Sequence, residues 1–542
     1  MSNLWKLASK PPPKKSKDWL IQILAKNRGL NTKKQLDEFL NPNLEQILAV
    51  KLSGLEKGVS RAIQAIKNKE KIIVYSDYDA DGICATAIMW ETLYDLGADV
   101  MPYVPHRVRE GYGLAKDAIS ELAKKGVDLI ITVDHGVTAV EQVEHAKSLG
   151  VDVIITDHHV LPDKLPKSIA LVHTTDLCGT GVSWRFCYEL IKKLAPNYED
   201  KLIEKLELAA IATIADLVPL IGGNRAIVKL GLVTLTKTKR PGIRALLNAS
   251  GVSGDIGTYE IGHILAPRIN AMGRIEHGLD SLRLICAKNQ SQADKLAQLL
   301  ARTNSKRQDL TASAITRAMD LVLKDDAVGV IANTSWHEGV IGLVASRLVE
   351  THHKPMIVIS QGEVYSKGSA RSIPGFNIVE AIRQSSEFLV DAGGHPMAAG
   401  FTIETRHIEA FRQKLNKYAR TIITEEILTP VIKIECELQK EEITRETYQI
   451  VKKFEPYGMA NPEPLFLTRN MVVEEARGVG QDSKHLKLQV DGFGAIGFNL
   501  GEHRSEIRPG YMVNLVYTIA QDNYNDNNNL QLKIKDLQIN NN

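Results

Sequence analysis

Three aspartates at alternate positions, Asp77, Asp79 and Asp81, are the residues whose spacing most clearly indicates chemistry. They follow KIIVYS (71–76), an apolar run that is typical of a β-strand. Alternate residues of extended backbone share one side and lie about 7 Å apart. Two negative charges at that distance repel by about 2 kcal/mol at an effective dielectric of about 20. The motif therefore predicts a positive partner, such as a metal ion.

Two other interpretations of this motif are open. An EF-hand calcium loop also begins D-x-D-x-D-G, but it needs a glutamate at its twelfth position and a helix in front. Here the twelfth residue is Ile88 and a strand precedes the motif. A solvated turn from strand to helix, with Asp81 as the N-cap, would explain one carboxylate and leave the other two without a role.

Acidic and imidazole side chains also follow two later apolar runs. VDLIITV (127–133) leads into Asp134, and VDVIIT (151–156) leads into Asp157-His158-His159. The carboxyl ends of parallel strands share one edge of a sheet, where ligands bind, so we expect these residues to meet in one crevice. Asp216, after the apolar helical stretch 206–215, is a further candidate. The predicted metal ligands are Asp79, Asp81, Asp134, His158 and Asp216.

The chemistry of this ligand set favours particular ions. Carboxylates with imidazole and no thiolate suit Mn²⁺ or Mg²⁺ better than structural zinc. About five ligands allow one carboxylate to bridge two ions. Two cations about 3.5–4 Å apart are the usual apparatus for in-line hydrolysis of a phosphate ester. We therefore expect two Mn²⁺ or Mg²⁺ ions and a phosphodiester hydrolase.

The elements that must position these residues follow from the apolar pattern. Runs rich in Ile and Val, about 25 residues apart between residues 71 and 172, predict a parallel sheet of βαβ units. A mostly polar helical region at 281–324 is typical of a connector. A second α/β unit with Gly-rich turns at 362, 368, 375, 393–394 and 400 follows, and six short strands beyond 428 predict a small barrel.

Composition limits the function classes. The 542 residues suggest three or four domains, and the net charge of only +3 means that any polyanion site must be a local groove. Five cysteines without CxxC spacing indicate neither a zinc finger nor a disulfide framework, and they favour a reducing compartment. Without a secretory leader or an apolar stretch of about 20 residues, we expect a cytoplasmic protein that does not enter a membrane.

Eleven motifs together resemble the DHH phosphoesterase superfamily, which is named after a triplet such as Asp157-His158-His159, and within it the RecJ family of bacterial single-strand-specific 5′→3′ exonucleases. The resemblance runs from about residue 20 to residue 540. Two departures from the family pattern, Ser76 and Met272, remove no ligand, although Met272 would reshape the substrate groove. The motifs are NRGLNTKKQLDEFLNP, DYDADG, VPHRVREGYGL, TVDHG, TDHH, ADLVPL, PRINAMGR, SWHEGVIGLVASRL, GSARS, GGHPMAAG and YGMANPEPLF.

The resemblance implies an α/β fold in which a parallel-sheet DHH domain is joined by a long helix to a smaller DHH-associated α/β domain, with a C-terminal OB-like β-barrel. The predicted domains are an N-terminal basic lead-in and helical segment (1–55), the DHH catalytic domain (56–280), the connector helix (281–326), the DHH-associated substrate-binding domain (327–425) and the OB-like nucleic-acid-binding domain (426–542).

The resemblance also implies roles for individual residues. The five predicted ligands would hold the two ions, Asp134 would serve catalysis, His159 would face the scissile phosphate, and Asp77 would orient a ligand or water. Ser369 and Arg371, in a Gly-flanked turn, would grip the 5′-terminal phosphate. On the residues alone, Arg371 would pair with a surface carboxylate. The other substrate contacts implied are Arg107 or Arg109, Arg274 and His395.

In the barrel, basic and aromatic side chains are candidates for binding single-stranded nucleic acid. They are Lys484, His485, Lys487, Phe493 and Phe498, of which we expect both phenylalanines to belong to the core.

The function implied is hydrolysis of single-stranded DNA from its 5′ end to 5′-mononucleotides, in DNA repair and recombination. The family implies a monomer whose partners are a single-strand-binding protein and a RecQ-type helicase. One alternative is a DHH phosphodiesterase acting on short oligoribonucleotides or cyclic dinucleotides, against which the barrel argues. Another is a non-catalytic replication scaffold, against which the complete ligand set argues.

Overall fold

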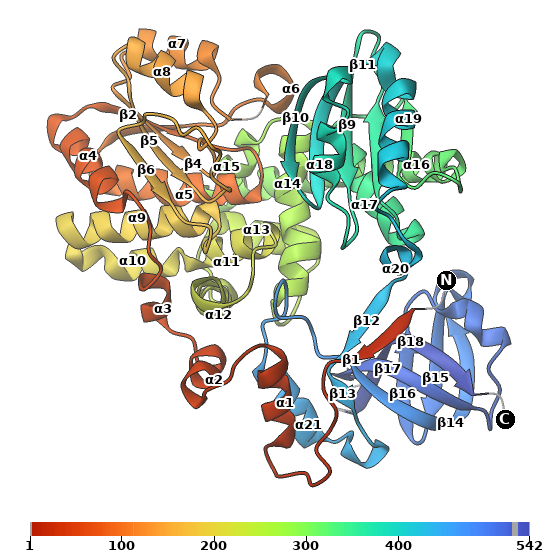
Figure 1. Cartoon of the computed structure of the whole chain (residues 1–542). Coiled ribbons are helices and arrows are strands. Elements are labelled where there is room, and N and C mark those ends of the chain that lie inside the picture. Colours follow the sequence, from red (N-terminus) through yellow and green to blue (C-terminus); the bar gives the residue numbers. More distant parts are fainter. Residues whose placement is uncertain (1–2, 112, 523–528, 541–542) are drawn as a thin grey trace. The chain divides into compact units, whose positions relative to one another are not determined.

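The computed structural model describes residues 3–111, 113–522 and 529–540, with the side chains of Val108 and Arg109 outside that description. Within these residues the chain forms two units (Figure 1). The first comprises Lys51–Asp216 and Gly231–Pro430, and the second comprises Asn3–Val50, Leu217–Leu230 and Val431–Asn542. None of the helices in the described part of the chain has both the length and the apolar character that crossing a bilayer requires.

The first unit begins with a five-stranded sheet in which all neighbouring strands are parallel, as the sequence predicts. Its strands, in spatial order, are β3 (Asp99–Tyr103), β2 (Lys71–Tyr75), β4 (Leu129–Val133), β5 (Asp152–Asp157) and β6 (Ala170–His173). Helices cover both faces, which is why the strands are near-continuous apolar runs. One face carries α7 (Lys116–Lys124) and α8 (Val140–Ser148), and the other carries α4 (Leu55–Asn68), α5 (Ala80–Asp95) and α9 (Gly179–Leu194) (Figure 1).

The strand order creates a switch point between β2 and β4. After β2 the chain forms β3 on one side of it, and then places β4 on the other side. The loops that leave β2 and β4 therefore turn toward opposite faces of the sheet and open a crevice at the carboxyl ends of these strands, where ligands bind in such folds. This crevice is where the Asp-rich motif and Asp134 lie.

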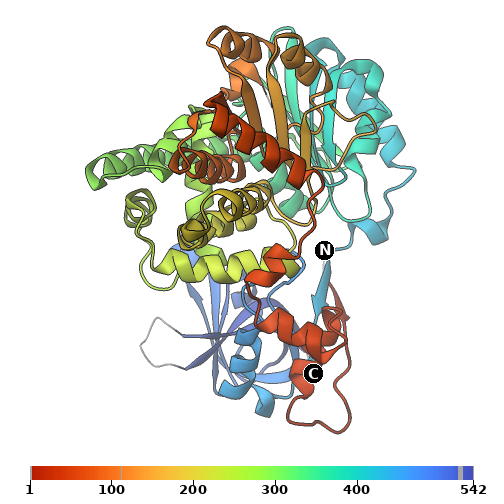
Figure 2. The ribbon, with the colours of Figure 1, turned by 90° about the vertical axis from the view of Figure 1, so that its left-hand side faces the viewer.

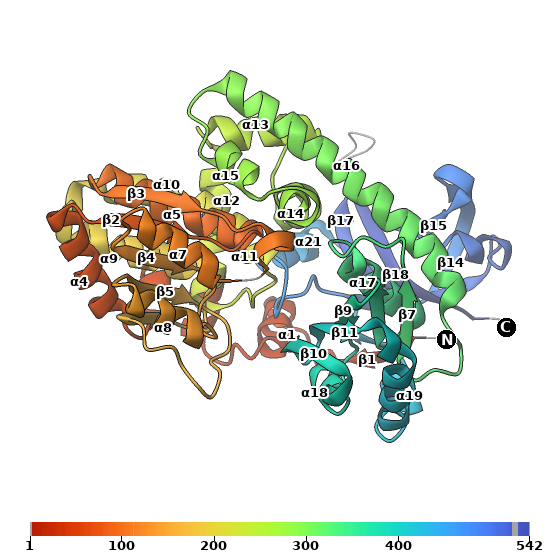
Figure 3. The same ribbon diagram turned by 90° about the horizontal axis from the view of Figure 1, so that it is seen from above.

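Helices connect the two sheets of the first unit. The region predicted as one helix at 281–324 is two helices, because the side chain of Asn289 accepts a hydrogen bond from the N–H of Gln292 and caps a new helix, α16. Figure 3 shows the 32-residue α16 running beside the second sheet. The helices of this region are α10 (Glu199–Glu204), α11 (Leu206–Ala215), α12 (Gly222–Thr236), α13 (Pro241–Ser250), α14 (Ala266–Ile275), α15 (Leu279–Ile285) and α16 (Gln290–Leu321).

The second sheet has five strands, bordered by α17 (Ile341–His352), α18 (Ile378–Arg383) and α19 (Ile408–Ala419). In spatial order the strands are β10 (Leu389–His395), β11 (Ala398–Glu404), β9 (Tyr365–Arg371), β8 (Met356–Ser360) and β7 (Gly329–Asn333).

Several glycines of this domain lie within β-strands, although the sequence predicts turns at these positions. Ser369 and Arg371 lie in β9, and the pair Gly393-Gly394 and His395 lie in β10. Gly368 pairs with Phe401 of β11, and a Cβ at Gly368 would lie 2.2 Å from the Phe401 ring. Glycine therefore makes room for a neighbouring ring in this strand.

The second unit contains the predicted barrel. Five strands close on themselves because β14 pairs with both β15 and β17. They are β14 (Phe466–Val479), β15 (His485–Val490), β16 (Phe493–Gly497), β18 (Leu530–Asn540) and β17 (Met512–Gln521), and β13 (Cys436–Glu437) pairs in parallel with the start of β14. The segment predicted as the first barrel strand divides, since β12 (Val431–Ile434) leaves the barrel and pairs in parallel with β1 (Leu4–Leu7).

The N-terminal helices pack against the barrel although they lie at the other end of the sequence (Figure 2). Leu20 and Leu24 of α1 (Trp19–Asn27) and Phe39 of α2 (Lys33–Leu40) belong to the barrel's hydrophobic core, which α21 (Arg445–Lys453) also joins. This contact gives the helices the apolar burial that so short a segment could not provide by itself.

Arg225 connects separate segments of this unit through hydrogen bonds. Its side chain is 1% exposed, and it donates hydrogen bonds of 2.6–3.1 Å to the carbonyl oxygens of Phe39, Phe454, Glu455 and Pro456. We expect Arg225→Met to leave these carbonyls without donors and to lower the free energy of unfolding by about 2 kcal/mol. Urea-induced unfolding measures this change. Arg508→Met, which replaces an exposed arginine of the same unit, is the control, and equal stability of the two variants would contradict the prediction.

Candidate metal centre

The Asp-rich motif forms the turn from β2 into α5. Asp79, rather than Asp81, is the N-cap, since its Oδ1 accepts hydrogen bonds from the N–H groups of Asp81 (2.9 Å) and Gly82 (3.0 Å). The carboxylate of Asp81 instead accepts the N–H groups of Gly179 and Thr180, each at 2.7 Å, at the start of α9. Two helix N-termini thus fix the two carboxylates, because unpaired N–H groups at such ends attract anions.

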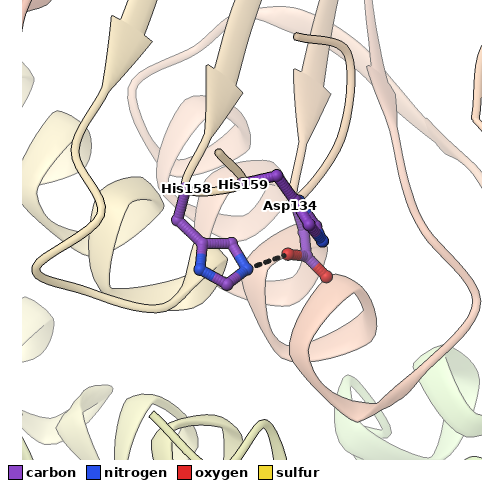
Figure 4. A group of neighbouring side chains, drawn as sticks. All are labelled: Asp134, His158 and His159. Carbon is purple, nitrogen blue, oxygen red and sulfur yellow. Dashed lines mark ion pairs between the residues drawn. The ribbon is translucent and has the colours of Figure 1, made fainter. Parts of the chain in front are cut away.

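Side chains from two other strands and one helix converge on this turn. Asp134 follows β4 with a φ of 67°, a backbone conformation that aspartate tolerates better than most residues. His158 follows β5, and Asp216 ends α11. The His158 Nε2 atom lies 3.2 Å from Asp134 Oδ1, 3.6 Å from Asp216 Oδ2 and 3.8 Å from Asp81 Oδ2. Figure 4 shows the His158 ring directed at the Asp134 carboxylate.

The potential ligand atoms form overlapping groups, each with all its atoms within 4.8 Å of one another. Asp134 and His158 connect the groups, because each belongs to two of them. Asp77, for which the sequence predicts an orienting role, lies within the same distance range as the predicted ligands. The groups are Asp81 with His158 and Asp216, Asp77 with Asp79 and Asp134, and Asp134 with His158 and His159.

Two atoms at the middle of this arrangement lack hydrogen-bond partners. Asp134 Oδ1 and His158 Nε2 are both buried, and neither has a hydrogen-bond partner in the described part of the chain. Buried polar atoms in proteins are normally hydrogen-bonded, so a carboxylate oxygen and an imidazole nitrogen facing each other are best explained as two ligands of one cation. Oxygen with imidazole nitrogen suits Mn²⁺ or Mg²⁺.

The pKa shifts of the clustered carboxyl groups also indicate a cation site. Burial, followed by repulsion from Asp81, raises the pKa of Asp134 well above its usual range and that of Asp216 to about 9. Burial and a neighbouring carboxylate likewise raise the pKa of Asp77 and of Asp79, whereas burial lowers the pKa of His158. Divalent cations would relieve this repulsion and release the protons.

Asp157, to which the sequence assigned no role, orients His159. Its carboxylate accepts hydrogen bonds from the N–H groups of Val137, His158 and His159, and from His159 Nδ1 at 2.7 Å. Burial disfavours a charged ring, but the bond to Asp157 outweighs it and raises the pKa of His159 to about 9. The His159 ring also stacks on that of His395, with 6.4 Å between centroids. The sequence signals for Asp157 are its place at the end of a buried strand and its membership of the Asp157-His158-His159 triplet, neither of which indicates that it orients a ring.

Two glycines and an asparagine also support the centre and were missed from the sequence. A Cβ at Gly179 would lie 2.4 Å from Asp134 Oδ1, and one at Gly273 would lie 2.4 Å from the carbonyl oxygen of Tyr78. Asn270 Oδ1 accepts the N–H of Ala80 at 2.7 Å. Met272, expected to reshape a substrate groove, is instead part of the core at 1% exposed.

The predicted phosphate-binding residues form a basic region in the same unit. Arg371 donates to Ser369 Oγ at 3.2 Å, and a Cβ at Gly342, near the start of α17, would approach both side chains to 3.0–3.1 Å. Arg274 donates to the carbonyl oxygen of Gly339 at 3.2 Å. Burial, and then the positive charge of Arg107, lowers the pKa of Arg274 to about 10.

These arginines are available for an anion. The Arg107 guanidinium lies 5.0 Å over the Tyr78 ring. Among the described residues, no carboxylate forms an ion pair with Arg107, Arg274 or Arg371, so the surface ion pair considered for Arg371 is not formed. Unpaired guanidinium groups next to a helix N-terminus suit a phosphate. The side chain of Arg109 lies outside the described residues.

In the barrel, the expectation for one aromatic residue is wrong. Phe498 is 55% exposed and packs edge-on against His485, because it lies in the loop after β16 and outside the strand alternation. Phe493 is partly buried against the barrel core. Lys484 is exposed and Lys487 is partly exposed.

Comparisons with known proteins match nearly the whole chain. Residues 71–216 match the DHH family, N-terminal domain, residues 308–421 match the DHHA1 domain, and residues 434–536 match the RecJ OB domain. The single-stranded-DNA-specific exonuclease RecJ of Bacillus subtilis is 37% identical, with 96% of this chain and 68% of that protein covered. The Haemophilus influenzae protein of the same name is 31% identical, with 95% of each covered. The crystal structure of RecJ in complex with Mn²⁺ from Thermus thermophilus superposes with a TM-score of 0.86, at 30% identity, over 99% of this chain and 79% of that chain.

Proposed function

The chain belongs to the RecJ family of single-stranded-DNA-specific exonucleases within the DHH phosphoesterases, and we propose that it hydrolyses single-stranded DNA from the 5′ end at a centre of two Mn²⁺ or Mg²⁺ ions. The observation that carries the proposal concerns Asp134 Oδ1 and His158 Nε2, which face each other at the switch point of the first sheet. Both atoms are buried, and among the described residues neither has a hydrogen-bond partner. Four further carboxylates, those of Asp77, Asp79, Asp81 and Asp216, surround this pair.

We assign the ligands from this geometry. Asp81, His158 and Asp216 would hold one ion and Asp79 the other, Asp134 would contribute to both because it belongs to two of the groups, and Asp77 lies close enough to join the second. When bound, such ions activate a water molecule and neutralise the charge that develops on the phosphate.

The side chains around the centre would orient the substrate. His159, kept protonated at neutral pH by Asp157, can donate a hydrogen bond to the scissile phosphate. Ser369 and Arg371 would bind the terminal 5′-phosphate, and Arg274, Arg107 and His395 the phosphates beside it. A terminal phosphate held next to the hydrolytic centre selects a free 5′ end. It also makes a 5′-mononucleotide the expected product.

Digestion of end-labelled DNA tests the proposal. With Mn²⁺ we expect 5′-phosphorylated single strands to yield mononucleotides, while blunt duplex and reactions with chelator stay intact. A di- or trinucleotide serves as a comparison substrate. Preferential hydrolysis of the short oligonucleotide, or cleavage that persists in chelator, would contradict the proposal.

Arg371→Ala tests recognition of the 5′ end. Loss of charge-assisted hydrogen bonds to a phosphate costs roughly 10- to 100-fold in kcat/KM, and we expect that loss on 5′-phosphorylated strands only. The measurement is the rate ratio between 5′-phosphorylated and 5′-hydroxyl strands at subsaturating concentration. Arg383→Ala, at the exposed end of α18, is the matched control. A ratio equal to that of the unsubstituted protein would remove Arg371 from this role.

The family alone supports the remaining parts of the proposal. They are a monomeric state, a cytoplasmic location, and a single-strand-binding protein and a RecQ-type helicase as partners. The cysteines are free thiols, which agrees with a reducing compartment. Size-exclusion chromatography and co-purification from cells test the oligomeric state and the partners.

A further inference from the structure

The first unit contains a cavity of about 630 Å³ that is separate from the metal centre. It lies against the carboxyl-terminal part of α5, and the metal centre lies at the other end of the same helix. At 1.5 Å rise per residue, Asp81 and Glu91 are about 15 Å apart along the helix axis. The rest of the lining comes from α10, Glu207 of α11, the end of α12, residues 237–241 up to the start of α13, and the segment after α15. The volume is typical of a site for a small molecule.

Aromatic rings form one part of the lining. Trp90 and Tyr94 pack with centroids 6.1 Å apart, and Tyr94 is 55% exposed. Tyr198 lines the same cavity from the segment before α10. An exposed ring on a cavity wall offers a flat face on which a planar heterocycle can stack.

The carboxylates of the cavity are already paired. Glu91 binds Arg240 through two bonds of 2.7 Å, and Glu207 binds the same guanidinium at 2.8 Å. Burial alone would raise the pKa of Glu91, but the hydrogen bonds from Arg240 outweigh this effect and lower the pKa to about 2. Glu204 pairs with Lys239 at 3.3 Å, and Asp95 accepts the hydroxyl of Tyr198.

Three lysines of the lining have no such partner. Among the described residues, Lys201, Lys237 and Lys288 pair with no carboxylate. The Lys201 ammonium lies 4.2 Å over the Tyr198 ring, and that of Lys288 lies 5.5 Å from the Tyr94 centroid. The cavity therefore combines free positive charge with aromatic faces, and these two features meet at two places on its wall.

We propose that this cavity binds a nucleoside 5′-monophosphate, with the base on the Tyr94 and Trp90 wall and the phosphate among Lys201, Lys237 and Lys288. A phosphate suits flexible ammonium groups that carry no other counter-ion, and a base is the planar group that stacks on exposed aromatic rings. The same ligand class is the product of the proposed exonuclease. That link rests on the proposed function, whereas the binding site itself does not.

Titration calorimetry with dAMP, in chelator and without DNA, tests the site, because chelation removes ion-mediated binding at the metal centre. We expect one dAMP per chain, bound at least tenfold more tightly than deoxyadenosine or inorganic phosphate. The charge-reversal variant Lys201→Glu/Lys288→Glu should weaken binding at least tenfold. Tyr94→Ala, an exposed position, should weaken dAMP and leave inorganic phosphate unchanged.

Two controls separate this site from the others. Lys295→Glu, an exposed lysine of α16 outside the cavity, and Arg371→Ala should both bind dAMP as the unsubstituted protein does. No binding of dAMP at millimolar concentration would overturn the proposal, as would binding that Arg371→Ala removes and the double variant keeps. The double variant should also degrade 5′-phosphorylated DNA with Mn²⁺ at the normal initial rate. Failure of the exonuclease proposal would instead appear as inactivity of the unsubstituted protein.

Discussion

Replacing Asp134 by asparagine is expected to lower the rate of single-stranded DNA hydrolysis by at least about a thousandfold, which corresponds to about 4 kcal/mol of transition-state stabilisation. Asp134 belongs to two of the three ligand groups and connects them. A neutral amide is a poorer ligand for a hard divalent cation, and it cannot neutralise one. Single-turnover digestion with Mn²⁺ measures the rate.

The same variant should remain folded and should still bind single-stranded DNA. Burial and four neighbouring carboxylates raise the folded pKa of Asp134 above its unfolded value, so its charged form destabilises the metal-free protein at neutral pH. Removing that charge should leave the thermal midpoint in chelator unchanged or higher. Binding of single-stranded DNA, made mainly by cationic side chains, should change by less than about threefold.

Asp163→Asn is the matched control for this experiment. Asp163 is exposed in the loop that follows His159, so the same substitution removes a nearby carboxylate outside the ligand groups. We expect this control to retain full activity. Substantial hydrolysis by purified Asp134→Asn would exclude Asp134 from the metal centre.

Replacing Asp157 by asparagine is expected to move the alkaline limb of the pH–rate profile to lower pH. The hydrogen bond to Asp157 raises the pKa of His159 to about 9, so the ring is protonated below that pH and loses its proton above it. Without the carboxylate, the pKa should fall toward its ordinary value of about 6.5. Because the protonated ring donates to the scissile phosphate in the proposed reaction, the rate at pH 8.5 should fall by roughly fifty- to a hundredfold in the variant.

A pH series of kcat/KM from 6 to 10 measures this shift, and the two proteins should differ least at the acid end. Asp176→Asn, at an exposed carboxylate just after β6, should show the unsubstituted profile. His159→Gln should lose the alkaline limb altogether, because the titrating group is gone. Superimposable profiles for Asp157→Asn and the unsubstituted protein would show that Asp157 does not set the charge of His159.

Much of the first domain follows from local pattern. Strands buried on both faces need continuous apolar side chains, so the runs at 71–76, 127–133 and 151–156 indicate parallel strands without any tertiary information. The edge on which the ligands meet follows as well, because parallel strands end at one edge regardless of their order, whereas the crevice itself depends on the switch point between β2 and β4. The meeting of Asp134 and His158 thus needs only their positions after two strands.

The glycines of the second sheet show where local pattern fails. Glycine suits a turn, and it equally suits a strand that must admit a neighbouring ring. Which of these applies at Gly368 depends on Phe401, a residue of another strand. The same limit explains Phe498, whose exposure depends on where β16 ends.

Periodicity and residue type act along the chain, so they were enough to predict the fold class, the kind of ligands and the edge of the sheet on which the ligands meet. Which atoms face each other depends on tertiary packing. That packing stacked His159 on His395, paired β1 with β12, and brought aromatic rings and lysines without carboxylate partners together in a second cavity. These arrangements depend on contacts between segments far apart in the sequence, and the free energy of such contacts leaves no local pattern.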